Sequence, residues 1–218
     1  MAGGGRAVEV EPERLLGWFD RFADRHGGLL AAGGTCRQVR FEAVDGASAE
    51  AAVPFGGLPS MPHDPAAVLD ALHAHLAAPR RVGIVLVRLG GHSIGVAVGG
   101  VVEASTTGAR PVHGRNRKGG SSSGRFARRR DNQVRVALDT AADAVARVLL
   151  PVADDLDAVV LGGDTAALDD LRADRRLAAL LARAEPRALD VPEPRRAVLD
   201  EAARRARAVE LVIREPAG

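Results

Sequence analysis

The residues best suited to do chemistry form one continuous segment, GRNRKGGSSSGRFARRRDNQ, which spans residues 114–133. Between residues 110 and 130, here called the basic segment, the chain has eight basic residues and no acidic one: Arg110, Arg115, Arg117, Lys118, Arg125, Arg128, Arg129 and Arg130. The rest of the chain holds 22 basic and 28 acidic residues, so an acidic body carries one strongly positive segment. Because a concentrated field steers polyanions to one place, we expect the segment to bind phosphates.

The centre of the basic segment, KGGSSSG at residues 118–124, allows more than one interpretation. It is not a phosphate-binding Walker loop, because that motif needs a lysine and a hydroxyl residue after its last glycine. A flexible Gly/Ser linker is one interpretation. The other is a tip that enters a narrow, phosphate-lined space, where only small residues fit and backbone N–H groups approach a reacting centre. Under both interpretations we expect the tip to be poorly packed in the free protein.

Composition limits the remaining possibilities. With 46% apolar residues among 218, the chain can bury a sizeable core, and its net charge is only +2. Cys36 is the only cysteine, which excludes an intrachain disulfide and fits a reducing compartment. The sequence has no secretory signal and no apolar run long enough to span a membrane, so a cytoplasmic protein is expected.

The patterns predict two parts. Residues 1–78 form a small α+β segment: a helix ending at Gly27, a hairpin turning at Asp45-Gly46, a stretch PFGGLPSMPHDP that is either a linker or a long loop, and a helix at about 65–77. Residues 79–218 are α/β: a three-stranded meander from residue 81, the basic segment, and a long helix at about 125–150. The sequences LDAVVLGG, DTAALDDLRADRRLAALLAR, RALDV, EPRRAVLDEAARRARA and VELVIRE then alternate as strand and helix. We expect a mixed sheet with helices on its faces.

The order of meander, basic glycine-rich segment and long helix resembles the peptide release factors of the eukaryotic and archaeal type, and more closely the actinobacterial Vms-like release factors, a peptidyl-tRNA hydrolase family. The resemblance covers roughly residues 81–215 and depends on RKGGSSSGRFARRR in that element order. It implies that this part has the RNase H-like fold of the release-factor middle domain. It also implies cleavage of the ester that joins a nascent peptide to tRNA, in the peptidyl-transferase centre of the large ribosomal subunit.

This resemblance assigns roles to residues of the segment. Gly119 and Gly120 let the backbone approach the ester, and Ser121 or Ser122 orients water through an N–H or a hydroxyl. Phosphates of the ribosome and of peptidyl-tRNA are bound by basic side chains: Arg115, Arg117, Lys118, Arg125, Arg128, Arg129 and Arg130. The family carries a glutamine where this chain has Ser121 or Ser122, so a non-catalytic ribosome- or RNA-binding protein is the alternative. No metal, cofactor, membrane or DNA partner is expected.

Other residues offer weaker signals. His73 and His75 lie two apart, which on a helix turns them away from each other and argues against a metal pair. Three carboxylates precede a strand: Asp154, Asp155 and Asp157. Carboxylates in this position are more often turn residues than ligands of a two-metal nuclease site. A nucleophilic serine is the less favoured mechanism, because nothing near the serines other than His113 could act as a general base. A helical stripe of Trp18, Phe19 and Phe22 indicates core packing.

Overall fold

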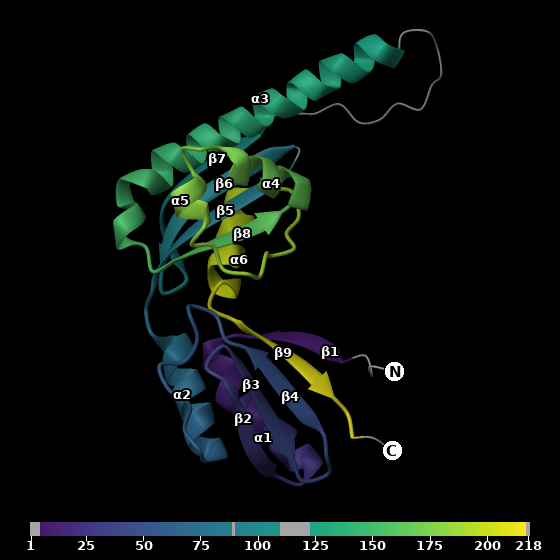
Figure 1. Ribbon diagram of the computed structural model, residues 1–218, viewed down its shortest axis with the longest axis vertical. Helices are drawn as coiled ribbons and strands as arrows, with labels where there is room; N and C mark the ends of the chain where they lie inside the picture. The colour runs from purple at the N-terminus through teal and green to yellow at the C-terminus, as the bar shows by residue number, and fades with distance from the viewer. Residues whose placement is uncertain (1–4, 89, 110–122, 217–218) are drawn as a thin grey trace. The chain divides into compact units, whose positions relative to one another are not determined.

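The computed structural model shown in Figure 1 describes residues 5–88, 90–109 and 123–216, with the side chains of residues 123–131 outside that description. The chain divides into two compact units. The first unit contains residues 1–79 and 204–218, and the second contains residues 80–203. Each unit has its own hydrophobic core.

The first unit is a five-stranded antiparallel sheet with two helices on one face (Figure 1). The strand order is β1-β9-β4-β3-β2, and the strands are β1 (Arg6–Val10), β2 (Leu29–Thr35), β3 (Gln38–Ala43), β4 (Ser48–Ala52) and β9 (Val209–Arg214). Strand β3 alternates strictly between exposed and buried residues, as a strand with one covered face should. Helices α1 (Pro12–His26) and α2 (Pro65–Ala77) supply the cover.

Local sequence signals set both helices. Pro12 opens α1, and Gly27 ends it in the left-handed conformation at φ +80°, where its N–H bonds to the carbonyl of Ala23. The Asp64 carboxylate caps α2 by accepting from the Ala67 N–H at 2.9 Å. Phe19 and Phe22 are buried against the sheet, which confirms the predicted helix and core packing of these two residues, whereas Trp18 is only partly buried.

Three features of the first unit differ from the expectation or were not expected. The strands β1 and β2 were not predicted, and the segment between β4 and α2 is an ordered loop rather than a linker, since Leu58 is buried and its N–H bonds to Cys36. The division of the chain also differs from the expected parts 1–78 and 79–218. The last strand, β9, returns to the first unit because its two edges pair with β1 and β4.

The second unit is built on a mixed sheet of order β7-β6-β5-β8, which confirms the expected sheet type. Strands β5 (Arg81–Arg88), β6 (Gly91–Val98) and β7 (Val101–Ala109) form the predicted antiparallel meander, and β8 (Ala158–Gly163) pairs with β5 in parallel. Six consecutive residues of β5 are buried, which indicates that both faces of the sheet are covered.

Helices on the two faces account for this burial. Helices α3 (Ser123–Leu149) and α4 (Thr165–Ala173) pack on the side of Val85 and Val87, with α5 (Ala178–Leu181) beside them. On the other side lies α6 (Arg196–Arg205), where a Cβ on Gly95 would come 2.8 Å from the Leu199 side chain. The 3-10 turn η1 (Leu150–Asp155) links α3 to β8.

Two predicted elements of the second unit were wrong. The single helix expected after β8 divides into α4 and α5, because the chain turns at Asp174, whose carboxylate accepts from the Arg176 backbone N–H. The expected strand RALDV contributes one isolated bridge, Leu189 to Gly162. Among the described residues, no helix is both long enough and apolar enough to cross a membrane.

Candidate functional site

The basic segment connects β7 to α3. Its residues 110–122 lie outside the described residues, and with them Arg115, Arg117, Lys118, Gly119, Gly120, Ser121 and Ser122, as well as His113. The predicted roles and the predicted poor packing of these residues therefore stay predictions. What the structure gives is the scaffold on both sides of the segment.

The end of the basic segment forms the first two turns of α3. The helix begins at Ser123 and its first turn contains no acidic residue, while Arg125, Arg128, Arg129 and Arg130 follow at once. The N-terminus of a helix carries a partial positive charge, so cations there are unfavourable and anions are favourable. This end of α3 therefore concentrates positive charge from the backbone and from four arginines, which a polyanion would neutralise.

The other half of α3 anchors the helix to the sheet. Ala141, Val145 and Leu149 are fully buried, at most 1% exposed, in the core of the second unit. Gly83 on β5 permits this close approach, because a Cβ there would lie 3.2 Å from a methyl carbon of Leu149. The N-terminal half extends beyond the sheet in Figure 1. The helix thus presents its basic end away from the core that holds it.

Side-chain hydrogen bonds also fix β7, the strand that leads into the basic segment. The hydroxyls of Ser93 and Thr107 lie 2.7 Å apart across β6 and β7. On α3, Arg147 donates to the Thr106 hydroxyl at 3.3 Å. From α6, Arg196 donates to the Ser105 hydroxyl at 3.0 Å. The strand is therefore tied to helices on both faces, so the segment starts from a rigid edge.

A buried histidine that the sequence analysis missed lies at the root of the basic segment, that is, beside the last residues of β7, where the segment starts. His92 on β6 is 7% exposed and pairs in register with Gly108, where a Cβ would come within 2.5 Å of the imidazole ring. The ring lines a cavity of about 90 Å³ together with Val134 and Leu138 of α3. Burial, and secondarily the charge of Arg147, lower the pKa of His92. The signal in the sequence was a single histidine opposite a glycine within an apolar meander.

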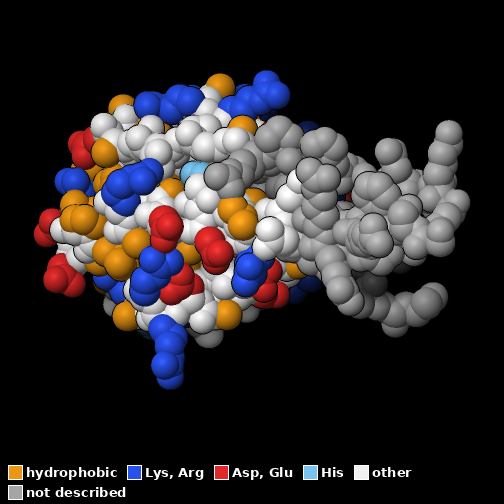
Figure 2. Space-filling model, turned by 90° about the horizontal axis from the view of Figure 1, so that it is seen from above, with side chains coloured by type: hydrophobic (Ala, Val, Ile, Leu, Met, Phe, Trp, Pro, Cys, Tyr) orange, Lys and Arg blue, Asp and Glu red, His pale blue; other side chains and the backbone are white. Residues whose placement is uncertain are grey.

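Side chains of both charge signs lie on the described face that Figure 2 shows. In Figure 2 the described face carries interspersed blue and red side chains with scattered hydrophobic ones. The concentration of positive charge in this part of the chain is the one that the sequence shows in the basic segment.

Two of the weaker candidates, His75 and Asp157, make structural hydrogen bonds. His75 bonds through Nε2 to the Pro54 carbonyl at 2.9 Å. The Asp157 carboxylate accepts from the Arg81 N–H at 2.7 Å, so it links the residue before β8 to the start of β5. Within the described ranges, no group of three or more His, Cys, Asp or Glu side chains is placed to hold a metal ion.

Comparison with known proteins bears on the second unit. A family model described as Actinobacteria/chloroflexi VLRF1 release factor matches residues 80–212. The match includes the meander, the basic segment, α3 and α6, which are the elements on which the predicted resemblance depends. No curated protein matches the chain. Since the match covers more than half of its length, the chain belongs to the Actinobacteria/chloroflexi VLRF1 release factor family.

Proposed function

We propose that the protein is a ribosome-dependent peptidyl-tRNA hydrolase that frees nascent peptides in the rescue of stalled ribosomes. The observation that carries the proposal is the position of the basic segment. Within the matched family region it joins the edge strand β7 to the positively charged end of α3. This arrangement favours insertion of a small-residue tip into an RNA-lined space while arginines hold phosphates.

The proposed chemistry is hydrolysis of an activated ester. The oxygen of a water molecule attacks the ester carbonyl carbon and gives up its proton, and the tetrahedral oxyanion collapses with cleavage of the bond to the ribose oxygen, which takes up a proton. The products are a free peptide carboxylate and a tRNA with a free hydroxyl. Positioning of water and stabilisation of the oxyanion account for most of such catalysis, and backbone N–H groups can supply both. In the proposal these groups belong to Gly119, Gly120, Ser121 and Ser122.

The fold of the second unit supports the RNase H-like assignment. An antiparallel meander continues into a parallel strand, and helices cover both faces of the sheet. The basic end of α3 projects from this platform. We propose that Arg125, Arg128, Arg129 and Arg130, with Arg115, Arg117 and Lys118, contact phosphates of ribosomal RNA and tRNA.

One observation favours a non-catalytic alternative. The only glutamines of the chain are Gln38 and Gln133, and they lie in β3 of the first unit and in α3. Neither is at the tip, where Ser121 and Ser122 stand. If the reaction requires a glutamine side chain, the protein would bind ribosomes without releasing peptide.

Release of labelled peptide from stalled ribosome complexes tests the proposal. Replacing both Gly119 and Gly120 by alanine should lower release at least about tenfold, some 1.4 kcal/mol in the barrier, because two Cβ groups obstruct the backbone approach. Ribosome affinity should stay within about threefold, under roughly 1 kcal/mol, because no charge is removed. A second variant, Ser122→Ala, separates a hydroxyl role, which predicts slower release, from a backbone role, which predicts the wild-type rate.

The matched control is Gly99→Ala in the turn between β6 and β7, where nothing lies within 4 Å of the added Cβ. Its own φ is +56°, so it bears the cost of a positive-φ alanine, and it lies outside the segment. Wild-type protein that binds ribosomes and releases no peptide, or a double alanine variant as fast as wild type, refutes the hydrolase and favours the binding protein.

A further inference from the structure

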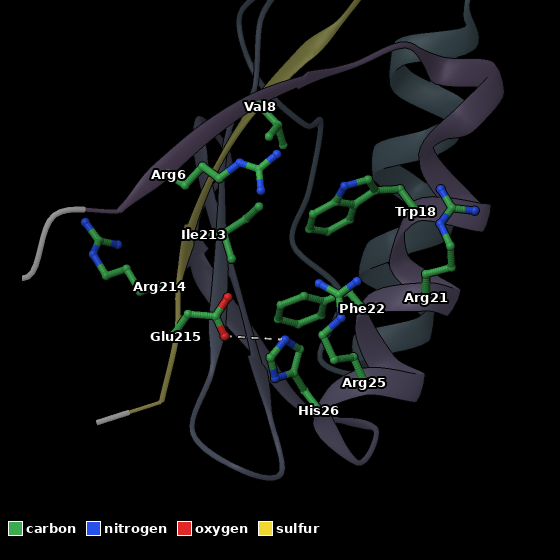
Figure 3. Close-up of a pocket in the computed structure, with 10 residues that line it drawn as sticks. All are labelled: Arg6, Val8, Trp18, Arg21, Phe22, Arg25, His26, Ile213, Arg214 and Glu215. Atoms are coloured by element: carbon green, nitrogen blue, oxygen red, sulfur yellow. Dashed lines mark ion pairs between the residues drawn. The ribbon is translucent and has the colours of Figure 1, made fainter. Parts of the chain in front are cut away.

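The first unit contains a cavity of about 600 Å³ that the proposed release activity does not use. It lies between one side of α1 and the ends of β1 and β9 (Figure 3). Val8, Ile213, Phe22 and Trp18 form apolar parts of its wall. Its volume falls within the range of about 300–1,000 Å³ that is typical of small-molecule sites.

Arginines surround this apolar wall. Arg6, Arg21 and Arg25 line the cavity, and among the described residues no carboxylate lies within 4.0 Å of their guanidinium groups. Arg214 also lines it but is paired with Glu50 at 2.8 Å. Arg21 and Arg25 are four residues apart on α1, a spacing at which like charges repel. The partial negative charge at the C-terminus of α1 partly stabilises the Arg25 guanidinium, whereas Arg6 and Arg21 lie outside the last turn of this helix.

One acidic side chain faces this group of cations. Glu215 lines the cavity, and its carboxylate lies 3.9 Å from His26, the pair that Figure 3 marks with a dashed line. His26 also bonds to Asp45 at 2.8 Å. The carboxylate is therefore directed to the histidine, and the three arginines remain available to an anion.

An aromatic platform accompanies the positive charge. Trp18 stacks on Phe22 with ring centroids 5.4 Å apart and planes at 11°. Both rings project from α1 toward Val8 and Ile213 in Figure 3. A partly exposed indole beside arginines is the combination that binds a nucleotide, because the base stacks on the ring and the guanidinium groups hold the phosphate.

We propose that this cavity binds a nucleotide, with its base against Trp18 and its phosphate at Arg6, Arg21 and Arg25. The nucleotide is either free or part of a single-stranded RNA, since both offer the same base and phosphate. An acidic peptide would satisfy the arginines but not the flat aromatic wall. The site would give the protein a nucleotide contact in the unit that lacks the basic segment.

The chain carries its own probe for this site. Trp18 is the only tryptophan and the sequence has no tyrosine, so tryptophan fluorescence reports on the cavity directly. Titrating the full chain with adenosine monophosphate and, separately, with a short oligouridylate RNA should give a saturable change in Trp18 emission. Tighter binding of the RNA assigns the site to RNA, and equal or tighter binding of the monophosphate assigns it to a free nucleotide.

Substitution of the two helix arginines tests the phosphate contact. The double variant Arg21→Gln and Arg25→Gln should raise the Kd at least about tenfold. Both positions are exposed, so the fold should be kept, which circular dichroism checks. The matched control is Arg14→Gln, an exposed arginine on the same helix outside the cavity, which should stay within about threefold.

Three results would overturn the proposal: no saturable change with either probe, equal effects of the double variant and the Arg14 control, or competition by oligoaspartate as strong as by the nucleotide. The triple variant Arg128→Gln, Arg129→Gln and Arg130→Gln should leave the Trp18 response to adenosine monophosphate intact, because those residues belong to the other unit. A chain that shows the Trp18 response but releases no peptide would uphold this site and refute the hydrolase, so the two failures are distinguishable.

Discussion

Both units carry several basic residues close together, but they assemble them in different ways. In the second unit the basic residues are contiguous in the sequence and lead into α3, whose N-terminal end extends beyond the sheet in Figure 1. In the first unit Arg6, Arg21 and Arg25 come from a strand and a helix and meet only around a cavity. The contiguous set can reach into a partner, whereas the assembled set can enclose a ligand.

The sheets of the two units differ in a way that matches this contrast. Strand β5 is buried on both faces, while β3 alternates and leaves one face open. A sheet between two helical layers holds α3 firmly enough to project it. The two-layer first unit leaves a gap between α1 and the ends of β1 and β9, and there the cavity forms.

The largest effect that we expect is a loss of stability in the core of the second unit alone. Leu149 is fully buried in the core of the second unit, so Leu149→Ala should lower the free energy of unfolding by about 3–5 kcal/mol. Denaturation followed by circular dichroism measures this loss. The matched control is Leu150→Ala, whose side chain is 38% exposed and should cost under about 1 kcal/mol.

Trp18 emission, which reports on the first unit, should keep its wild-type midpoint in Leu149→Ala, because the two hydrophobic clusters share no residue. A parallel shift of both signals would mean that the two units unfold as one cooperative body, and it would contradict the expectation that their cores are energetically separate.

The next effect concerns the projecting charge. If roughly 4–6 phosphates are contacted, the affinity for ribosomes should fall with salt at a logarithmic slope of about −3 to −5. Between 50 and 200 mM salt this amounts to roughly a hundredfold to a thousandfold. Neutralising Arg128, Arg129 and Arg130 together should flatten the slope, as measured by ribosome sedimentation at several salt concentrations.

The double variant Arg21→Gln and Arg25→Gln is the comparison for this measurement, because it removes two charges from the first unit. It should change the slope less than the triple variant does. Affinity that is insensitive to salt and to both variants would contradict electrostatic binding through the basic segment.

The contrast between contiguous and assembled features also explains what the sequence predicts. Helix α1 with its Gly27 cap, the β5 to β7 meander and the basic segment depend on residues near one another in the chain, and they are visible in it. The glycine- and alanine-rich β2 has little intrinsic strand propensity, so only its pairing with β3 defines it. Strand β9 returns to the first sheet because it pairs with β1, roughly two hundred residues earlier in the chain. The pattern of apolar and polar residues within β9 does not reveal which strand it pairs with.

The candidate sites follow the same rule. The basic segment was found by counting charges, and it lies within the residues that the family model matches. The cavity of Arg6, Arg21 and Arg25 was not found, because its residues stand apart in the sequence among many other arginines. His92 was missed because only its burial and its register with Gly108 distinguish it from a surface histidine.

The smallest effect that we expect is on the pH dependence of stability, to which a different titratable group contributes in each unit. In the second unit burial lowers the pKa of His92, so the folded protein takes up its proton less readily than the unfolded chain does. In the first unit the pKa of Asp45 is lowered, chiefly because its carboxylate accepts from the Ala47 N–H and secondly from His26. Each group contributes stability above its unfolded pKa and loses that contribution as the pH falls.

The windows differ because the ordinary pKa values differ, about 6.5 for histidine and about 3.9 for aspartate. Between pH 7 and 5 the unfolded chain binds more protons at His92 than the folded chain does. Lowering the pH over this interval should therefore lower the free energy of unfolding by at most about 1.4 kcal/mol per pH unit. His92→Gln, which cannot titrate, should lose less stability than wild type over this interval, as measured by denaturation at each pH. Asp45→Asn should lack the loss of stability that this carboxyl gives wild type as the pH falls through about 4. If His92→Gln and wild type lose stability in parallel between pH 7 and 5, the imidazole at the root of the basic segment is not held neutral by burial.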